Sequence, residues 1–500
     1  MPSSGTTPIR IPPNMMSVVT ETNIFRSDDL AIDFFSWRDG HNQTVAITFT
    51  PFGIVGAVSL DGAGFGGELL LRNNFDIVAF KSTKNVWYQN ITPEILSAVE
   101  NFIATRATHA ARYDKRVGYG SSMGGYAAIQ FSRSLKLDTV FALSPQFEID
   151  QPYDLRWHAA AQSIDFKYRI GADAIAANCK YFVAYDPGTE DLHHVEKLRE
   201  LICPERLIEI ATPFSGHPAG HYLAETGLIK DLALSVLKDG IVEHIAVGRH
   251  RKRSKTYFYE MSRRLVLRRK YRSAMIAIDK AIAIDDTSPL LHKQRSVVFD
   301  KLGQPEAALA AIDKAITIGG SAIDLLLQRS EVLEHMEHQA AALLAIDEAI
   351  NIDGEAPELH VRRSIVLDRL GRRAEALDAI HKARRSMKND APLIGALSDR
   401  LAKHGDLAGA LELVDKAIAI DANELQFHLH KCAVCKALGF IPEAISAGET
   451  ALKLAPYNVS LLARLSGLHA RQGGIDHWKR SFKLAGLALS RLVRSSRAHS

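Results

Sequence analysis

A period of 34 residues runs through the C-terminal half of the chain and restricts its fold more than any other feature. A tripeptide similar to Lys-Ala-Ile returns at this spacing, and two further columns of small residues keep the same register. Self-similarity at such a period indicates stacked supersecondary units, and small residues in fixed register predict close contacts between helices. The central alanines of the tripeptide are Ala281, Ala315, Ala349, Ala383, Ala417 and Ala451.

A fourth column marks the turn inside each unit. Glycine occupies it at Gly303, Gly371, Gly405, Gly439 and Gly473, whereas Arg269 and Glu337 replace it in two units. Glycine is typical of the residue after a helix end, so each unit is expected to be a helix hairpin. The pattern resembles the tetratricopeptide repeat (TPR), with about seven units over 255–488 and a tail at 489–500. This resemblance implies a superhelix with a concave binding surface.

The N-terminal half has a different pattern. Short apolar runs alternate with helical spacing over 30–240, after an N-terminal extension at 1–29 and before a basic linker at 241–254. This alternation predicts an α/β domain with an open parallel sheet covered by helices on both faces. The expected strands are 43–49, 75–80, 115–120, 138–144, 180–185 and 206–211, and the expected helices are 92–108, 123–135, 191–202 and 222–237.

One strand of this domain leads through a glycine-rich turn directly into a helix. The turn reads Gly120-Ser121-Ser122-Met123-Gly124. A sharp strand-to-helix turn crowds the residues two before and two after its apex, and glycine at both positions relieves the clash. Ser122 is therefore the candidate nucleophile, and Ser121, which lacks the flanking glycines, is the weaker one.

A serine nucleophile needs a base and an acid that orients the base. Asp186 follows an expected strand directly, so it should emerge at the same sheet edge as Ser122. Glu190 and Asp191 are rival acids farther from the strand end. His217 follows the last strand and is the preferred base, with His221 as the alternative.

Taken together, these residues resemble the α/β-hydrolase fold, whose triad follows the chain order Ser122, Asp186, His217. The resemblance implies that the backbone N–H of Met123 is one oxyanion donor. The second should come from the loop after 43–49, where Pro51 has no N–H, so Phe52 or Thr50 must supply it. No HGGG-type run is present, which departs from many lipases.

Metal and nucleotide sites are not expected. Cys432 and Cys435 fit the small and apolar columns of the repeat and are interpreted as packing residues rather than zinc ligands. The glycine-rich segment 62–67 lacks the strand-to-helix setting of a dinucleotide site and is interpreted as a flexible loop beside the active site. We therefore expect no metal and no organic cofactor.

Composition bounds the setting of the protein. Hydrophobic residues make up 47% and charged residues 24% of the chain, and the net charge of +4 is too small to favour nucleic acid as a partner. No secretion signal or membrane span is recognisable, so a cytoplasmic location is expected. In the repeats, the acidic side chains expected to face the groove are Asp300, Glu331, Glu334, Asp368 and Asp399.

The sequence thus predicts a serine hydrolase acting on a carboxylic ester, with a repeat array that binds a protein partner or positions the enzyme. One alternative is a thioesterase or peptidase, because these acyl transfers share the same triad. The other is an inactive hydrolase-fold scaffold whose TPR array does the work.

Overall fold

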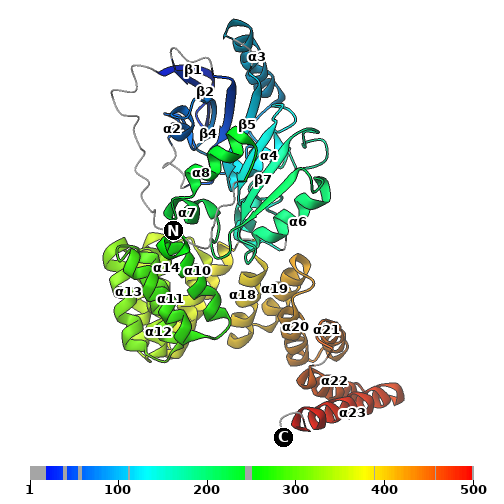
Figure 1. Ribbon diagram of the computed structural model, residues 1–500. Helices are drawn as coiled ribbons and strands as arrows, with labels where there is room; N and C mark the ends of the chain where they lie inside the picture. Colours follow the sequence, from blue (N-terminus) through cyan, green and yellow to red (C-terminus); the bar gives the residue numbers. More distant parts are fainter. Residues whose placement is uncertain are drawn as a thin grey trace. The chain divides into compact units, whose positions relative to one another are not determined.

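The chain forms two compact units, as a computed structural model of the protein shows (Figure 1). One unit ends at Gln304 and the other begins at Pro305. The change of sequence pattern near residue 255 is therefore not the boundary between the two units, because the first helices of the array belong with the sheet. The structure describes residues 19–37, 42–53, 59–110, 113–151, 153–242, 250–387, 389–456 and 458–497.

The six predicted strands are confirmed and form the parallel part of one sheet. Continuous apolar runs suit these strands because helices cover both of their faces. Their bounds are β3 (Thr44–Phe49), β4 (Asp76–Ser82), β5 (Lys115–Ser121), β6 (Thr139–Leu143), β7 (Lys180–Tyr185) and β8 (Leu207–Ala211).

Two N-terminal strands, β1 (Val19–Arg26) and β2 (Leu30–Trp37), were not predicted and make the sheet mixed. The order is β1-β2-β4-β3-β5-β6-β7-β8, with β2 antiparallel to both of its neighbours. All of β1 thus lies within the expected extension at 1–29, where its polar residues hide the strand pattern. In β2, Asp33 interrupts the apolar run but forms a buried ion pair of 2.6 Å with Lys81 of β4.

Side chains that alternate along the strands feed two cores, one on each face of the sheet. Ile47 and Val78 belong to the first core, while Ala46 and Ile77 belong to the second. The first core includes residues of α3 (Pro93–Ala110), α4 (Met123–Gln130) and α6 (Asp191–Leu201); the second includes residues of α2 (Gly67–Leu71), α7 (Ala219–Glu225), α8 (Ile229–Leu234) and η2 (Ser235–Asp239). The single helix expected at 222–237 is therefore divided into several pieces.

The rest of the chain is helical, and within each unit neighbouring helices pack against each other (Figure 1). Its last helix extends to Arg497, so the expected tail at 489–500 is helical over most of its length. The first unit contains α10 (Lys255–Leu267), α11 (Tyr271–Ile284) and α12 (Pro289–Lys301). The second contains α13 (Pro305–Gly319), α14 (Ile323–His335), α15 (Gln339–Ile352), α16 (Pro357–Arg369), α17 (Arg373–Arg385), α18 (Ala391–His404), α19 (Leu407–Ile420), α20 (Leu425–Leu438), α21 (Ile441–Leu454), α22 (Val459–Gln472) and α23 (Ile475–Arg497).

The turn column of the repeat has a positive φ throughout the array, although Gly473 differs from the others in its ψ of 179°. Its five glycines have positive φ angles, between 72° at Gly303 and 94° at Gly405. Arg269 (φ 57°) and Glu337 (φ 61°) adopt the same left-handed conformation despite their side chains. The predicted role of this column is thus confirmed, and the two substituted positions carry the strain that glycine avoids.

Candidate active site

Ser122 lies at the apex of the turn between β5 and α4, in a strained backbone conformation with φ 53° and ψ −119°. Its backbone N–H donates to the carbonyl of Leu143 at 2.8 Å. A Cβ atom on Gly120 would lie 2.2 Å from the carbonyl oxygen of Gly124, and one on Gly124 would lie 2.3 Å from that of Phe49. The expected need for glycine on both sides of Ser122 is therefore real.

The structure brings Ser122 and His217 together. Ser122 Oγ lies 2.9 Å from His217 Nε2. His217 is in the loop between β8 and α7, whereas His221 lies within α7 and is exposed. Of the two candidate bases, His217 is the one placed at the nucleophile.

The acid beside His217 is Asp191, and the choice of Asp186 is wrong. The two carboxylate oxygens of Asp191 lie 2.9 and 3.1 Å from His217 Nδ1. Asp186 instead accepts hydrogen bonds from the backbone N–H groups of Gly188 (3.0 Å) and Gly216 (2.9 Å). The sequence favours Asp186 because it directly follows β7, whereas Asp191 lies five residues farther along the chain. The turn after β7 folds back, however, and brings Asp191, the first residue of α6, to His217.

A buried network supports the acid. Arg156 donates to Asp191 at 2.9 Å and to Asp154 at 2.7 Å, and His194 contacts Asp154 at 2.9 Å. Burial acts to raise the pKa of Asp191, but His217 and Arg156 outweigh it and lower that pKa to about 2. Asp191 is therefore negatively charged at neutral pH, as the partner of a histidine base must be.

Gln146 is a site residue that the sequence did not reveal. Its Nε2 donates to Ser122 Oγ at 2.8 Å and lies 3.1 Å from His217 Nε2. Trp87 donates its indole N–H to Gln146 Oε1 at 3.3 Å, and since indole can only donate, this contact fixes the orientation of the amide. Gln146 follows β6 at the same sheet edge as Ser122, a position that could have marked it as a candidate.

The expected oxyanion donors are backbone N–H groups, and the structure shows which of them already have a hydrogen-bond acceptor. Met123 is the first residue of α4, where a backbone N–H has no acceptor within its helix. Thr50 is ruled out because its N–H donates to the carbonyl of Phe80 at 3.1 Å. Phe52 remains as the second candidate, in a loop that Asn85 holds through both backbone groups of Gly53.

Aromatic rings line one side of the triad. The ring centre of Trp157 lies 5.5 Å from that of His217, 5.2 Å from Phe52 and 5.4 Å from Trp87. Phe52 is 38% exposed, so this cluster reaches the surface. The aromatic cluster thus places apolar surface beside His217.

The cysteines of the array take part in packing. Cys432 and Cys435 are buried in one core cluster, and His430 contacts Ser398 Oγ at 2.9 Å. Within the described parts of the chain, no group of His, Cys, Asp and Glu side chains has the arrangement of a metal site. None of the described helices is long and apolar enough to cross a membrane.

The segment 62–67 and the acidic side chains of the array both differ from the predictions. The segment 62–67 is held in place, because Lys81 donates to the carbonyl of Gly62 at 2.9 Å and Phe65 packs on Tyr119. In the array, Glu334 pairs with Arg362 and Arg369, and Asp368 pairs with Arg400, Lys403 and His404. Part of the expected acidic groove is therefore neutralised by basic side chains.

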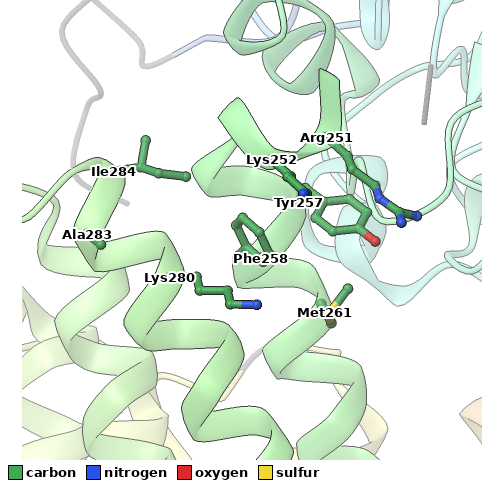
Figure 2. Close-up of a pocket in the computed structure, with 8 residues that line it drawn as sticks. All are labelled: Arg251, Lys252, Tyr257, Phe258, Met261, Lys280, Ala283 and Ile284. Atoms are coloured by element: carbon green, nitrogen blue, oxygen red, sulfur yellow. The ribbon is translucent and has the colours of Figure 1, made fainter. Parts of the chain in front are cut away.

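A hollow of about 540 Å³ opens beside α10 and α11 (Figure 2). Figure 2 shows the aromatic rings of Tyr257 and Phe258 with basic side chains around them. The lining residues include neither Ser122 nor His217; they are Arg251, Lys252, Tyr257, Phe258, Met261, Lys280, Ala283 and Ile284.

Comparison with known proteins finds likeness among solved structures alone. No protein-family model matches the chain. No curated protein sequence matches it either. PilF of Pseudomonas aeruginosa is 20% identical, covers 42% of this chain and 94% of its own, and gives a TM-score of 0.34.

Two further structures are described as TPR proteins. TTC0263 of Thermus thermophilus is 17% identical over 36% of this chain and 98% of its own, with a TM-score of 0.33. A protein of Parabacteroides merdae is 14% identical over 47% of this chain and 93% of its own, with a TM-score of 0.35. The solved structures to which this chain is similar thus include repeat proteins of the kind that the 34-residue period resembles.

Proposed function

We propose that the sheet-containing part of the chain is a serine hydrolase of the α/β-hydrolase type that cleaves a carboxylic ester. The observation that carries this proposal is a continuous chain of contacts: 2.9 Å from Ser122 Oγ to His217 Nε2 and 2.9 Å from His217 Nδ1 to Asp191. The three residues follow the order Ser, Asp, His along the chain, and the serine sits on a strand-turn-helix apex.

The contacts assign a role to each residue. Ser122 Oγ attacks the acyl carbon while His217 Nε2 takes its proton, and His217 then passes that proton to the leaving alcohol. Asp191 accepts a hydrogen bond from Nδ1–H and stabilises the imidazolium that forms. Water, activated by the same histidine, then attacks the acyl-serine and releases the acid.

Gln146 and the backbone donors complete the proposed site. Since Gln146 donates to one lone pair of Ser122 Oγ, the hydroxyl hydrogen is directed toward His217. The N–H groups of Met123 and Phe52 are proposed to hold the oxyanion of the tetrahedral intermediate. The acyl chemistry leaves a thioester or a peptide as alternative substrates of the same triad.

We further propose that the helical array binds a protein partner. Successive hairpins make an extended surface, and extended surfaces of solenoids commonly serve as binding sites. If the triad were inactive, this binding would be the principal function of the protein, as the scaffold alternative states.

A fluorophosphonate probe tests the proposed chemistry, because it reacts with activated serines. We expect covalent labelling of the purified protein at Ser122, identified by peptide mass, and loss of labelling in Ser122→Ala. Ser121→Ala is the matched control, since it removes the neighbouring hydroxyl and should still be labelled. If the folded wild-type protein resists labelling, the proposal of a serine hydrolase fails and the scaffold alternative takes its place.

The acyl class is tested next on the unlabelled protein, in which Ser122 is free to react. Hydrolysis rates of matched p-nitrophenyl ester, thioester and peptide substrates with the same acyl group would rank the three alternatives. We expect the ester to be cleaved with the highest kcat/KM.

A further inference from the structure

The first helix of the array packs against the loop that carries His217. On α10, the ring centre of Tyr257 lies 5.5 Å from that of Phe214, and the guanidinium of Arg264 lies 4.6 Å from the centre of the same ring. A Cβ atom on Gly216 would lie 3.0 Å from the carboxyl carbon of Glu260. The helix therefore contacts this loop at Phe214 and Gly216, close to His217 in sequence.

An ion pair also connects α10 to the loop that carries His217. Asp186 is fully buried, and Arg264 forms an ion pair with it. The second contact of that carboxylate oxygen is the backbone N–H of Gly216, at 2.9 Å. The chain of contacts thus runs from Arg264 through Asp186 to the backbone N–H of Gly216, the residue directly before His217.

Other charged groups near this ion pair come from α10 itself. Glu260 is buried and pairs with Arg263 at 3.1 Å. The pKa of Glu260 is raised, mainly because burial disfavours its charged form. Arg264 is thus the side chain of α10 that pairs with Asp186, whereas Arg263 forms an ion pair with Glu260.

We propose that Arg264 is a positioning residue for His217, so that the helical array takes part in building the catalytic site. This inference rests on the proposed hydrolase function and adds a residue that the triad does not contain. Arg264 pairs with Asp186, and Asp186 accepts the backbone N–H of Gly216. Asp191 holds the ring of His217 from the other side. Both restraints together fix Nε2 at hydrogen-bond distance from Ser122.

Loss of the arginine leaves a buried carboxylate without its partner. Such a group reorients or draws in water, because an unpaired buried charge is costly. Gly216 then loses a fixed acceptor, and the His217 ring is held from one side only. The expected consequence is a slower reaction of Ser122 in a protein that is still folded.

The test is a double-mutant cycle on the full-length protein with the fluorophosphonate labelling rate as readout. Arg264→Met should lower the rate at least about 10-fold, as misplacement of a catalytic group does. In a His217→Ala background the same substitution should change the rate less than about 2-fold, because its effect passes through His217. Arg264→Lys keeps the positive charge and should recover part of the rate. Arg268→Met is the matched control, because Arg268 directly follows α10, lies four residues after Arg264 and is exposed.

Two results would overturn the inference: a wild-type labelling rate in folded Arg264→Met, or an equal loss with and without His217. If Arg264→Met does not fold, Gly188→Ala decides, because its Cβ would come within 2.2 Å of Arg264 Nη1 and displace the guanidinium. A wild-type rate in folded Gly188→Ala and Arg264→Lys would then reject the inference.

A proton NMR measurement, which does not depend on catalysis, tests the positioning role separately from the proposed activity. The Nδ1 proton of a histidine bonded to a carboxylate gives a downfield proton NMR signal, which His217→Ala would identify by its loss. Arg264→Met should shift or broaden this signal, and Arg268→Met should not. If wild-type protein is not labelled but the signal responds to Arg264, the activity proposal fails while the positioning role stands. An unchanged signal in Arg264→Met rejects the positioning role.

Discussion

Ser122 is contacted by two side chains that come from distant parts of the sequence. His217 lies 95 residues away and Gln146 lies 24 residues away, yet both are within 2.9 Å of Ser122 Oγ. The contact between Ser122 and His217 could be predicted, because glycine spacing marks Ser122 and position after a strand marks His217. The acid could not, since Asp186 and Asp191 both follow β7 and the sequence does not tell which carboxylate the turn presents to His217.

The assignment of Asp191, rather than Asp186, as the partner of His217 can be tested by substitution. Asp191→Asn should lower kcat/KM, or the labelling rate of Ser122, by about 10³–10⁴-fold, because an amide cannot fix the tautomer of the base. Asp186→Asn keeps a side chain that can still accept from Gly216, so its loss should be clearly smaller. Parallel rate measurements on both folded variants decide; a larger loss in Asp186→Asn would contradict the assignment.

The charge of Asp191 also predicts a pH dependence of stability. Its pKa is about 2 in the folded protein and about 3.9 in an unfolded chain, so the depressed value stabilises the fold by about 3 kcal/mol above pH 4. That contribution is lost as the pH falls from about 4 toward 2. Urea titrations between pH 5 and 3 should therefore show a shallower decline of the apparent free energy of unfolding in Asp191→Asn than in wild type. Identical slopes would show that Asp191 is not held in its charged form.

For single helices, strands and turns, the sequence predicts the structure well where one backbone conformation strongly favours one residue type. The turn column of the repeat is an example, because a left-handed residue must follow each first helix and glycine adopts that conformation most easily. Strands β1 and β2 show the opposite case. Polar side chains in β1 and the Asp33–Lys81 ion pair hide the apolar pattern, and only pairing with a partner strand satisfies them.

The two exceptions in the turn column predict stabilising substitutions. Arg269→Gly and Glu337→Gly should each raise the free energy of unfolding by about 0.5–1 kcal/mol, because glycine relieves the left-handed strain but costs some chain entropy. Gly371→Ala is the matched reverse change, at a φ of 72° with open space around its Cβ, and should destabilise the protein by about 1 kcal/mol. Thermal or urea unfolding measures all three; a loss of stability in both glycine variants would contradict the argument.

For the whole molecule, the main finding is that the first array helices belong to the same unit as the sheet. Tyr257 of α10 is buried in the second sheet core, and Arg264 neutralises Asp186. The repeat register starts before this unit ends, so a division based on sequence periodicity separates residues that pack together. The proposed catalytic site consequently depends on a helix that the repeat pattern assigns to the array.

Truncation of the chain tests this dependence. A chain of residues 1–304 keeps α10 and its contacts, so it should remain soluble and be labelled at Ser122 at close to the full-length rate. A chain of residues 1–242 lacks Tyr257 and Arg264, exposes part of the sheet core, and should aggregate or lose labelling. Gel filtration and the labelling rate measure both effects. Equal behaviour of the two shortened chains would show that α10 is dispensable.

Local patterns in the sequence are enough to predict the parallel strands, the helix hairpins and the positions of Ser122 and His217. Each depends on a local rule: apolar runs for buried strands, a fixed period for stacked helices, and glycine where a turn is crowded. The tertiary structure alone decided that Asp191 meets His217, that Gln146 meets Ser122 and that Arg264 meets Asp186. These contacts join residues from different loops and helices, and packing of the complete unit, rather than any local preference, brings their side chains within hydrogen-bond distance.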